Sequence, residues 1–187
     1  MAERRDLGFC IHVRRNRIEF RASQGRARTV GDYQCYWWGR SLDGLGGQIV
    51  ECGGPGDNTD AVGDAQDRRI SAGAYPLVVH ASLKYRTFAY TSSEESKAKP
   101  RPALRLDATG ERDGILIHPS SGYLWSQGCL NPCSELSDAA SDIDYRDSRR
   151  RVIAIIDSLV ASLGARMPKT PGTRIPDAFV LIEGEPV

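Results

Sequence analysis

The clearest helical pattern in this chain lies near its C-terminus, and it determines what the rest of the fold must cover. In residues 148–164, apolar side chains recur at i, i+3, i+4, i+7, i+8 and i+11: Val152, Ile155, Ile156, Leu159, Val160 and Leu163. This spacing predicts an amphipathic helix with one buried face. Asp147 or Ser148 is the expected N-cap, and Gly164 is the expected end. We assign the stripe to the hydrophobic core rather than to a functional site.

The segments before this helix have the alternation and composition of β-strands. The first has two expected apolar faces, before and after a turn at residues 14–16: Phe9, Ile11 and Val13, then Ile18 and Phe20. Further strands are predicted at residues 30–42, 46–54, 74–82, 85–91, 103–109, 114–118 and 178–183. The polar stretches 53–68 and 92–103 are predicted surface loops, and 134–147 is a short helix or irregular cover.

No internal repeat or low-complexity linker divides the sequence, so we predict a single domain over residues 1–187. Its predicted class is mainly β or α+β, with the long C-terminal helix of residues 148–164 packed on the strands. A chain of 187 residues is long enough to bury a hydrophobic core without disulfides or metal.

Charge and hydropathy argue against two kinds of partner. The net charge of +1 gives no general reason to expect nucleic acid or a membrane surface. Eight arginines fall within residues 1–30, and we expect them on solvated strand faces. The longest apolar runs are too short to cross a bilayer, and the N-terminus has no apolar signal-peptide core. We therefore expect synthesis in the cytoplasm without a signal peptide.

The five cysteines do not form a disulfide framework by number or spacing, so a reduced state is expected. Cys35 and Cys52 flank a glycine-rich turn and are candidates for pairing only in an oxidising compartment. Cys133 is either a resolving thiol for Cys129 or an inert neighbour. The carboxylates of loop 53–68 lack the spacing of a calcium loop, and we expect no metal and no cofactor.

One pair of residues is a candidate for chemistry. His118 ends a predicted strand, and Cys129 follows Gly128 in a polar turn eleven residues later. A reachable thiol beside an imidazole can lose its proton and act as a nucleophile. The alternative is a satisfied histidine at a strand end and an inert thiol. His12 and His80 lie within strand-like alternation and are expected to be packed or edge residues.

At these residues the chain resembles the catalytic domain of the L,D-transpeptidase (YkuD-type) superfamily. "IH" followed by a loop and "SQGCLNP" is similar to its histidine and Ser/Thr-x-Gly-Cys signature, closest to a short-gap branch with an IHxGN…DTxGCI-like motif. "RTVGDYQCYWWGRSL", "RRISAGAYPLVV" and "PALRLDATGERDGILIH" resemble upstream segments of that branch. The resemblance covers roughly residues 27–133, and it implies an L,D-transpeptidase-like β-sandwich.

The resemblance implies a role for each residue of the motif. Cys129 would be the nucleophile and His118 its base, oriented by the Pro119 carbonyl. The backbone N–H groups of Gly128 and Cys129 would hold the oxyanion. Ser126 would order the turn.

The residues around the motif are candidates for binding the substrate, and some of them depart from the family. Tyr123 and Trp125 lie between base and nucleophile, where they line a groove or close over the core. Gln127 replaces the histidine and Asn131 the arginine common in the family, and both are assigned to substrate binding. Ser120 replaces a glycine. These departures argue against a housekeeping crosslinking enzyme more than against cysteine acyl chemistry.

The expected activity is cysteine-dependent acyl transfer or cleavage at amide bonds of peptidoglycan stem peptides. Because peptidoglycan lies outside the cytoplasm, such a chain needs non-classical export to a periplasm. A secreted antibacterial effector or a phage lysis factor would meet that need, with a secretion apparatus or an immunity protein as partner. The alternatives are a catalytically degenerate peptide- or glycan-binding module on the same fold, and cytoplasmic acyl transfer on an unrelated amide.

Overall fold

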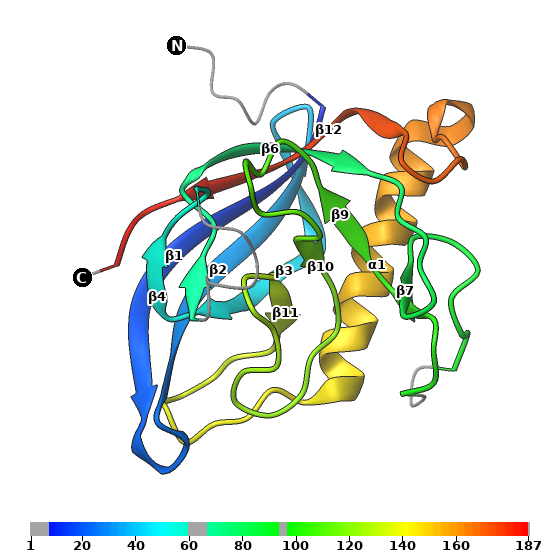
Figure 1. Cartoon of the computed structure of the whole chain (residues 1–187). Helices are drawn as coiled ribbons and strands as arrows, with labels where there is room; N and C mark the ends of the chain where they lie inside the picture. Colours follow the sequence, from blue (N-terminus) through cyan, green and yellow to red (C-terminus); the bar gives the residue numbers. More distant parts are fainter. Residues whose placement is uncertain (1–7, 60–66, 94–96, 187) are drawn as a thin grey trace.

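The computed structural model describes residues 8–59, 67–93 and 97–186 (Figure 1). Its strands are β1 (Phe9–Arg21), β2 (Arg26–Trp37), β3 (Arg40–Cys52), β4 (Gly54–Gly56), β5 (Arg68–Arg69), β6 (Gly73–Val78), β7 (Tyr85–Arg86), β8 (Arg101–Pro102), β9 (Leu104–Leu106), β10 (Leu116–Ile117), β11 (Asn131–Cys133) and β12 (Arg174–Glu183). The helices are α1 (Tyr145–Leu163) and the single 3₁₀ turns η2 (Ala22–Gln24) and η3 (Gly164–Arg166). The prediction of a β-rich fold with one long C-terminal helix is confirmed.

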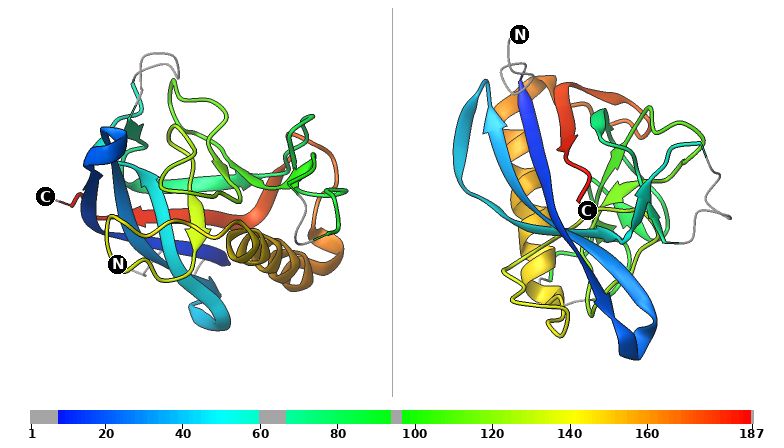
Figure 2. Two further views of the ribbon diagram at one scale, coloured as in Figure 1. Left: turned by 90° about the horizontal axis from the view of Figure 1, so that it is seen from below. Right: turned by 90° about the vertical axis from the view of Figure 1, so that its left-hand side faces the viewer.

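Within the described residues, eight strands form one sheet in the order β10-β9-β6-β12-β1-β2-β3-β11. β1 pairs with β12 in parallel, and the other neighbours in this sheet are antiparallel. Figure 2 shows that the sheet is strongly curled, with the end of the long β1–β2 hairpin extending beyond its other strands. These eight strands therefore form one continuous curled sheet, where a sandwich of two stacked sheets was expected. β4–β5 and β7–β8 form two separate parallel pairs.

The two edges of this sheet meet and nearly close it. Ile117 of β10 forms a parallel bridge with Leu130, the residue immediately before β11. The Leu130 amide donates to the Leu116 carbonyl at 2.8 Å, and the His118 amide donates to the Leu130 carbonyl at 3.1 Å. We call this contact between residues 116–118 and 129–131 the seam. It joins the segment that carries the candidate histidine to the segment that carries the candidate cysteine.

Helix α1 lies against one side of the curled sheet (Figure 2). The predicted stripe is buried, except for the partly buried Val160, and it joins the inward side chains of the strands in one core cluster. The helix begins earlier than predicted, because Asp144 is the N-cap and its side chain accepts from the Asp147 amide. It ends at Gly164 as predicted, where φ is +54°.

The first strand differs from its prediction. Residues 14–16 form no turn; β1 is continuous, with an irregularity in its pairing between Arg15 and Arg17. A bulge absorbs the irregular residue without reversing the chain. Beyond the bulge the odd-numbered residues of β1 pair with even-numbered residues of β2, so they lie on the opposite face of the sheet, where Glu19 is buried. Ile18 and Phe20 are 41% and 61% exposed. The predicted second apolar face is wrong.

The same strand pair corrects the expectation that the N-terminal arginines are solvated. Arg15 is buried and donates through Nε and Nη2 to both carboxylate oxygens of Glu51 at 2.9 Å. Arg28 is fully buried and pairs with Glu19. Burying a guanidinium is costly unless it is paired and hydrogen-bonded, and both arginines meet that condition. They stabilise the fold rather than forming an exposed anion-binding patch.

Candidate active site

The seam brings the candidate cysteine and histidine to one face of the structure. In a strand ladder side chains alternate, so residues 116, 118, 129 and 131 project opposite to Ile117 and Leu130, which are both buried in the core. His118 contacts Asn131, and the Leu116 amide contacts the Cys129 sulfur. Cys129 and His118 are thus diagonal neighbours, with Cβ atoms expected about 7 Å apart from ladder geometry.

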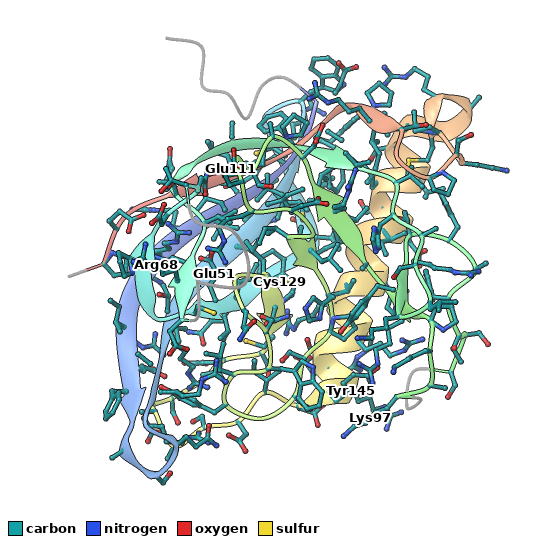
Figure 3. All side chains as sticks on the ribbon, in the orientation of Figure 1. Glu51, Arg68, Lys97, Glu111, Cys129 and Tyr145 are labelled. Atoms are coloured by element: carbon teal, nitrogen blue, oxygen red, sulfur yellow. The ribbon has the colours of Figure 1, made fainter. Side chains whose placement is uncertain are left out.

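Cys129 is partly exposed, and it is labelled near the centre of Figure 3. Its Sγ accepts a hydrogen bond from the Leu116 amide at 3.3 Å and lies 3.8 Å from the Gly114 carbonyl oxygen. Burial raises the pKa of the thiol to about 11, and the Leu116 hydrogen bond only partly offsets this. The thiol is therefore protonated at neutral pH.

His118 is buried and held in one tautomer. Its Nδ1 lies 2.8 Å from the Pro119 carbonyl oxygen, which can only accept, so Nδ1 carries the proton. The Tyr85 ring packs on the imidazole with centroids 4.7 Å apart. Burial lowers the His118 pKa to about 4, although the Pro119 hydrogen bond acts in the opposite direction. The ring is neutral at pH 7, with the lone pair on Nε2, and Pro119 occupies the orienting position expected of it.

These protonation states correct one expectation from the sequence. A thiolate–imidazolium pair needs a thiol pKa below the imidazole pKa, and here the order is reversed by a wide margin. Desolvation of both groups is the physical cause. The resting pair is a neutral thiol and a neutral imidazole, so proton transfer would have to accompany attack on a substrate.

The turn that presents Cys129 is fixed from inside the protein. Ser126 Oγ–H donates to Asn131 Oδ1 at 2.8 Å and lies 3.3 Å from the Cys129 carbonyl oxygen, as expected for a residue that orders the turn. Asn131 Nδ2 donates to the His118 carbonyl at 2.9 Å. Asn131 therefore links the cysteine turn to the histidine strand. Because it is fully buried, its assignment to substrate binding is wrong.

Gly128 has a different role from the one expected. Its amide donates to the buried Cys52 Sγ at 3.1 Å, and the Cys52 thiol donates to the Ser126 carbonyl at 3.1 Å. The Gly128 N–H is therefore directed into the protein instead of toward an oxyanion. Among the described residues, no hydrogen bond engages the Cys129 amide. Gly128 is required for shape, because its φ is +95° and a Cβ would collide with Arg112 Nη2.

The remaining binding candidates separate into two groups. Tyr123 is 2% exposed, its hydroxyl donates to the Glu19 carbonyl at 2.6 Å, and the Arg21 and Arg28 guanidinium groups lie within 4.3 Å of its ring centroid. It closes over the core, and its assignment to a substrate groove is wrong. Trp125 and Gln127 are exposed and line a cavity of about 520 Å³. These two stay candidates for contact with substrate.

Several residues that shape this site carried no recognisable signal in the sequence. Arg112 is fully buried and donates to the Arg68 carbonyl at 3.0 Å and to the Asp57 and Gln127 carbonyls at 3.4 Å, which ties the cysteine turn to the loop before β5. Cys52 and Tyr85 act through contacts that exist only in the folded chain. The burial of Arg112 could not be predicted, because it is an isolated arginine in a polar turn.

The other histidines and cysteines lie outside this arrangement. His12 Nε2 lies 2.7 Å from Glu183 Oε2 and lines a separate polar cavity, and His80 lies in the loop after β6. Cys133 is fully buried and burial raises its pKa to about 12, which favours the inert reading. Cys35 and Cys52 belong to different core clusters, and no disulfide joins the cysteines of the described residues.

No cluster of three or more histidine, cysteine or acidic side chains is arranged to hold a metal ion in residues 8–59, 67–93 and 97–186. Over the same ranges, no helix combines the length and apolar character needed to cross a membrane. The acidic loop positions 60 and 64 lie outside the described residues.

Comparison with known proteins adds no assignment. No protein-family model, curated protein or solved structure matches this chain. The functional argument therefore depends on the geometry of the seam and on the motif that it carries.

Proposed function

We propose that the protein is a cysteine-dependent acyltransferase or peptidase of L,D-transpeptidase type, acting on amide bonds of peptidoglycan stem peptides. The observation that carries the proposal is the seam, which puts a partly exposed Cys129 on the same face as His118 with the imidazole tautomer fixed by Pro119. A base whose Nδ1–H is tied to a carbonyl presents Nε2 as the proton acceptor.

The neutral pair determines the order of events. Nε2 of His118 takes the thiol proton as the Cys129 sulfur bonds to the substrate carbonyl carbon, and the carbonyl π electrons move to oxygen. The Cys129 amide donates to that oxyanion. Collapse of the tetrahedral intermediate breaks the C–N bond, and the leaving amine takes the proton from His118. A second amine or water then attacks the thioester carbonyl as His118 Nε2 takes its proton; the C–S bond breaks and the Cys129 sulfur recovers that proton. Attack by the amine gives a crosslink or exchange, and attack by water gives cleavage.

The test is incubation with purified muropeptides, with products followed by mass spectrometry. The wild-type chain should convert at least one stem type and accumulate a covalent adduct at Cys129. Cys129→Ala should abolish conversion, and His118→Gln should reduce it by at least about 100-fold, which is the usual contribution of a general base. Cys133→Ala is the matched control, since that thiol is buried and takes no part in the proposed chemistry. Unchanged muropeptides with every stem type tried would reject the proposal.

The proposed substrate requires delivery to the cell wall, and we propose a secreted antibacterial effector or a phage-related factor. Expression of the chain with a periplasmic targeting sequence in a sensitive bacterium should be toxic, and the Cys129→Ala version should be harmless. Equal growth with both versions would remove the toxin proposal without affecting the muropeptide assay.

A second candidate function is a peptide- or glycan-binding module on the same fold that has lost its chemistry. The raised pKa of Cys129 and the internal engagement of the Gly128 amide favour it. This candidate requires that muropeptides bind equally to the wild type and to Cys129→Ala, and that no adduct forms. Turnover by the wild type would exclude it.

A further inference from the structure

A small cavity lies beside the residue that orients His118. Its volume is about 30 Å³, and Pro119, Ser120, Trp125 and Tyr145 contribute to its lining. This volume corresponds to about one water molecule or one oxygen-sized group. Trp125 also borders the larger cavity near Gln127, so the two cavities are neighbours.

Two cationic side chains converge on this cavity. Lys97 and Arg101 both line it, with Lys97 Nζ 5.5 Å and Arg101 Cζ 6.0 Å from the centroid of the Tyr145 ring. Figure 3 shows Lys97 next to Tyr145, the first residue of α1. Within residues 8–59, 67–93 and 97–186, neither cation forms an ion pair with a carboxylate. Most arginines that shape this fold do have an acidic partner, so this pair differs from them.

A buried hydroxyl completes the lining. Ser120 is 2% exposed, and its backbone is held because its amide donates to Ser148 Oγ of α1 at 3.0 Å. Its own Oγ has no hydrogen-bond partner among the described residues. A buried hydroxyl without a partner is unfavourable, and it is stabilised when an acceptor binds.

The cavity is connected to the candidate base. Arg101 interacts with the Tyr85 hydroxyl, and the Tyr85 ring packs on His118. Pro119 both lines the cavity and accepts from His118 Nδ1. A group bound here therefore lies along the flank of the imidazole.

We propose that this cavity is a carboxylate-binding subsite, in which Lys97 and Arg101 pair with the anion and Ser120 Oγ–H donates to one of its oxygens. A carboxylate can place one oxygen in a space of this size and has only one other oxygen to accommodate at the opening, whereas a phosphate has three. Only the identity of the ligand rests on the proposed function: the carboxylate belongs to the amide substrate of Cys129. It selects substrates with an acidic group close to the bond that is broken.

The test is a titration of the full-length Cys129→Ala protein at constant ionic strength, with acetate, acetamide and phosphate as separate probes. Amide chemical shifts of Ser120 and the indole shift of Trp125 report on the cavity. Acetate should produce saturable shifts, and acetamide, which has the same shape without the charge, should produce none. Phosphate should bind more weakly than acetate. Equal shifts with acetamide, or tighter binding of phosphate, would overturn the carboxylate assignment.

Variants then test the named residues. Lys97→Gln and Arg101→Gln should each weaken acetate binding about tenfold, the usual effect of losing one charge-assisted hydrogen bond. Arg101→Lys keeps the charge and should recover part of the affinity. Lys169→Gln, an exposed lysine away from the cavity, is the matched control and should bind like the parent. Unchanged affinity in both glutamine variants would reject the subsite.

The two proposals can fail separately, because acetate binding is measured in a protein that lacks the nucleophile. Acetate binding with inert muropeptides would reject the acyl-transfer proposal and keep the subsite. Muropeptide turnover without any acetate response would do the reverse.

Discussion

Cys129 should react slowly with iodoacetamide at neutral pH even though it is the accessible thiol. Its pKa is raised to about 11 by burial. At pH 7 about one molecule in 10⁴ then carries the thiolate, compared with about 3% for an ordinary cysteine of pKa about 8.5. The thiolate population is therefore about 300-fold lower. A more basic thiolate is more nucleophilic, which recovers about 10- to 20-fold, so the alkylation rate should be about 20- to 30-fold below that of an unhindered thiol.

The assay is alkylation of the native protein between pH 6 and pH 10, followed by digestion and mass spectrometry of the peptide containing Cys129. The other cysteines are fully buried, so the native reaction reports on Cys129. The rate should rise about tenfold per pH unit up to pH 10 without a plateau. The same peptide alkylated in urea is the reference for an ordinary thiol.

The His118→Gln variant provides the internal control. A neutral imidazole stabilises no thiolate, so removing it should leave the alkylation profile unchanged while it lowers turnover of an amide substrate by at least about 100-fold. A plateau with a midpoint below about pH 7, lost in His118→Gln, would refute the reasoning. It would show that the resting protein holds a thiolate–imidazolium pair.

Three further predictions concern stability and binding. The His118 pKa is about 4 in the fold and 6.5 in the unfolded chain, so the unfolded state gains its proton first as the pH is lowered. The free energy of unfolding should therefore decrease by about 2 kcal/mol between pH 7 and pH 4.5. Urea unfolding measures this loss, and His118→Gln should lack it. Gly128→Ala should cost about 1–3 kcal/mol and most activity, since a side chain at φ +95° would displace Arg112; unchanged unfolding would contradict this. Tyr123→Phe should lower the free energy of unfolding by about 1 kcal/mol and leave muropeptide binding intact. Trp125→Ala should weaken muropeptide binding and change the free energy of unfolding by less than about 0.5 kcal/mol. The reverse pattern would show that Tyr123 contacts the substrate.

The parts of the fold that sequence could predict are those with a local cause. The stripe from Val152 to Leu163 specifies a buried helix face by its period alone, and Gly164 ends the helix because it adopts a positive φ. Asp144 was missed as the N-cap because Asp147 and Ser148 are equally suitable residue types. Choosing among neighbouring caps depends on how the preceding chain reaches the helix, which periodicity does not contain.

The parts that sequence could not predict depend on contacts between distant segments. Arg15 looked like a solvated charge, but its partner Glu51 lies on another strand. Ile18 and Phe20 looked like core residues, but the pairing irregularity near Arg15 changes which face of the sheet each later residue of β1 occupies, and these two are exposed. In each case the residue type was known, and the register that decides its environment came from the folded sheet.

The candidate site shows the same division. His118 and Cys129 could be chosen as a pair from their residue types and from the glycine before the cysteine, and Pro119 occupies the orienting position expected of it. The protonation states could not be predicted, because the spacing of two residues does not report how far each is desolvated. The misassigned residues, Tyr123 and Asn131, are buried, and aromatic or amide side chains in a loop give no sign of whether they face solvent.

The seam accounts for the positions of the candidate residues and for their protonation states. Closing the sheet needs backbone hydrogen bonds on both sides of Leu130, and those bonds set the offset between residues 116–118 and 129–131. The same closure removes water from the imidazole and the thiol, which raises one pKa and lowers the other. The seam thus fixes the positions of His118 and Cys129, and it keeps both side chains neutral at pH 7 in the absence of substrate. The proposed reactivity must then come from a bound substrate, so we expect to see it in turnover and not in the alkylation of the free thiol.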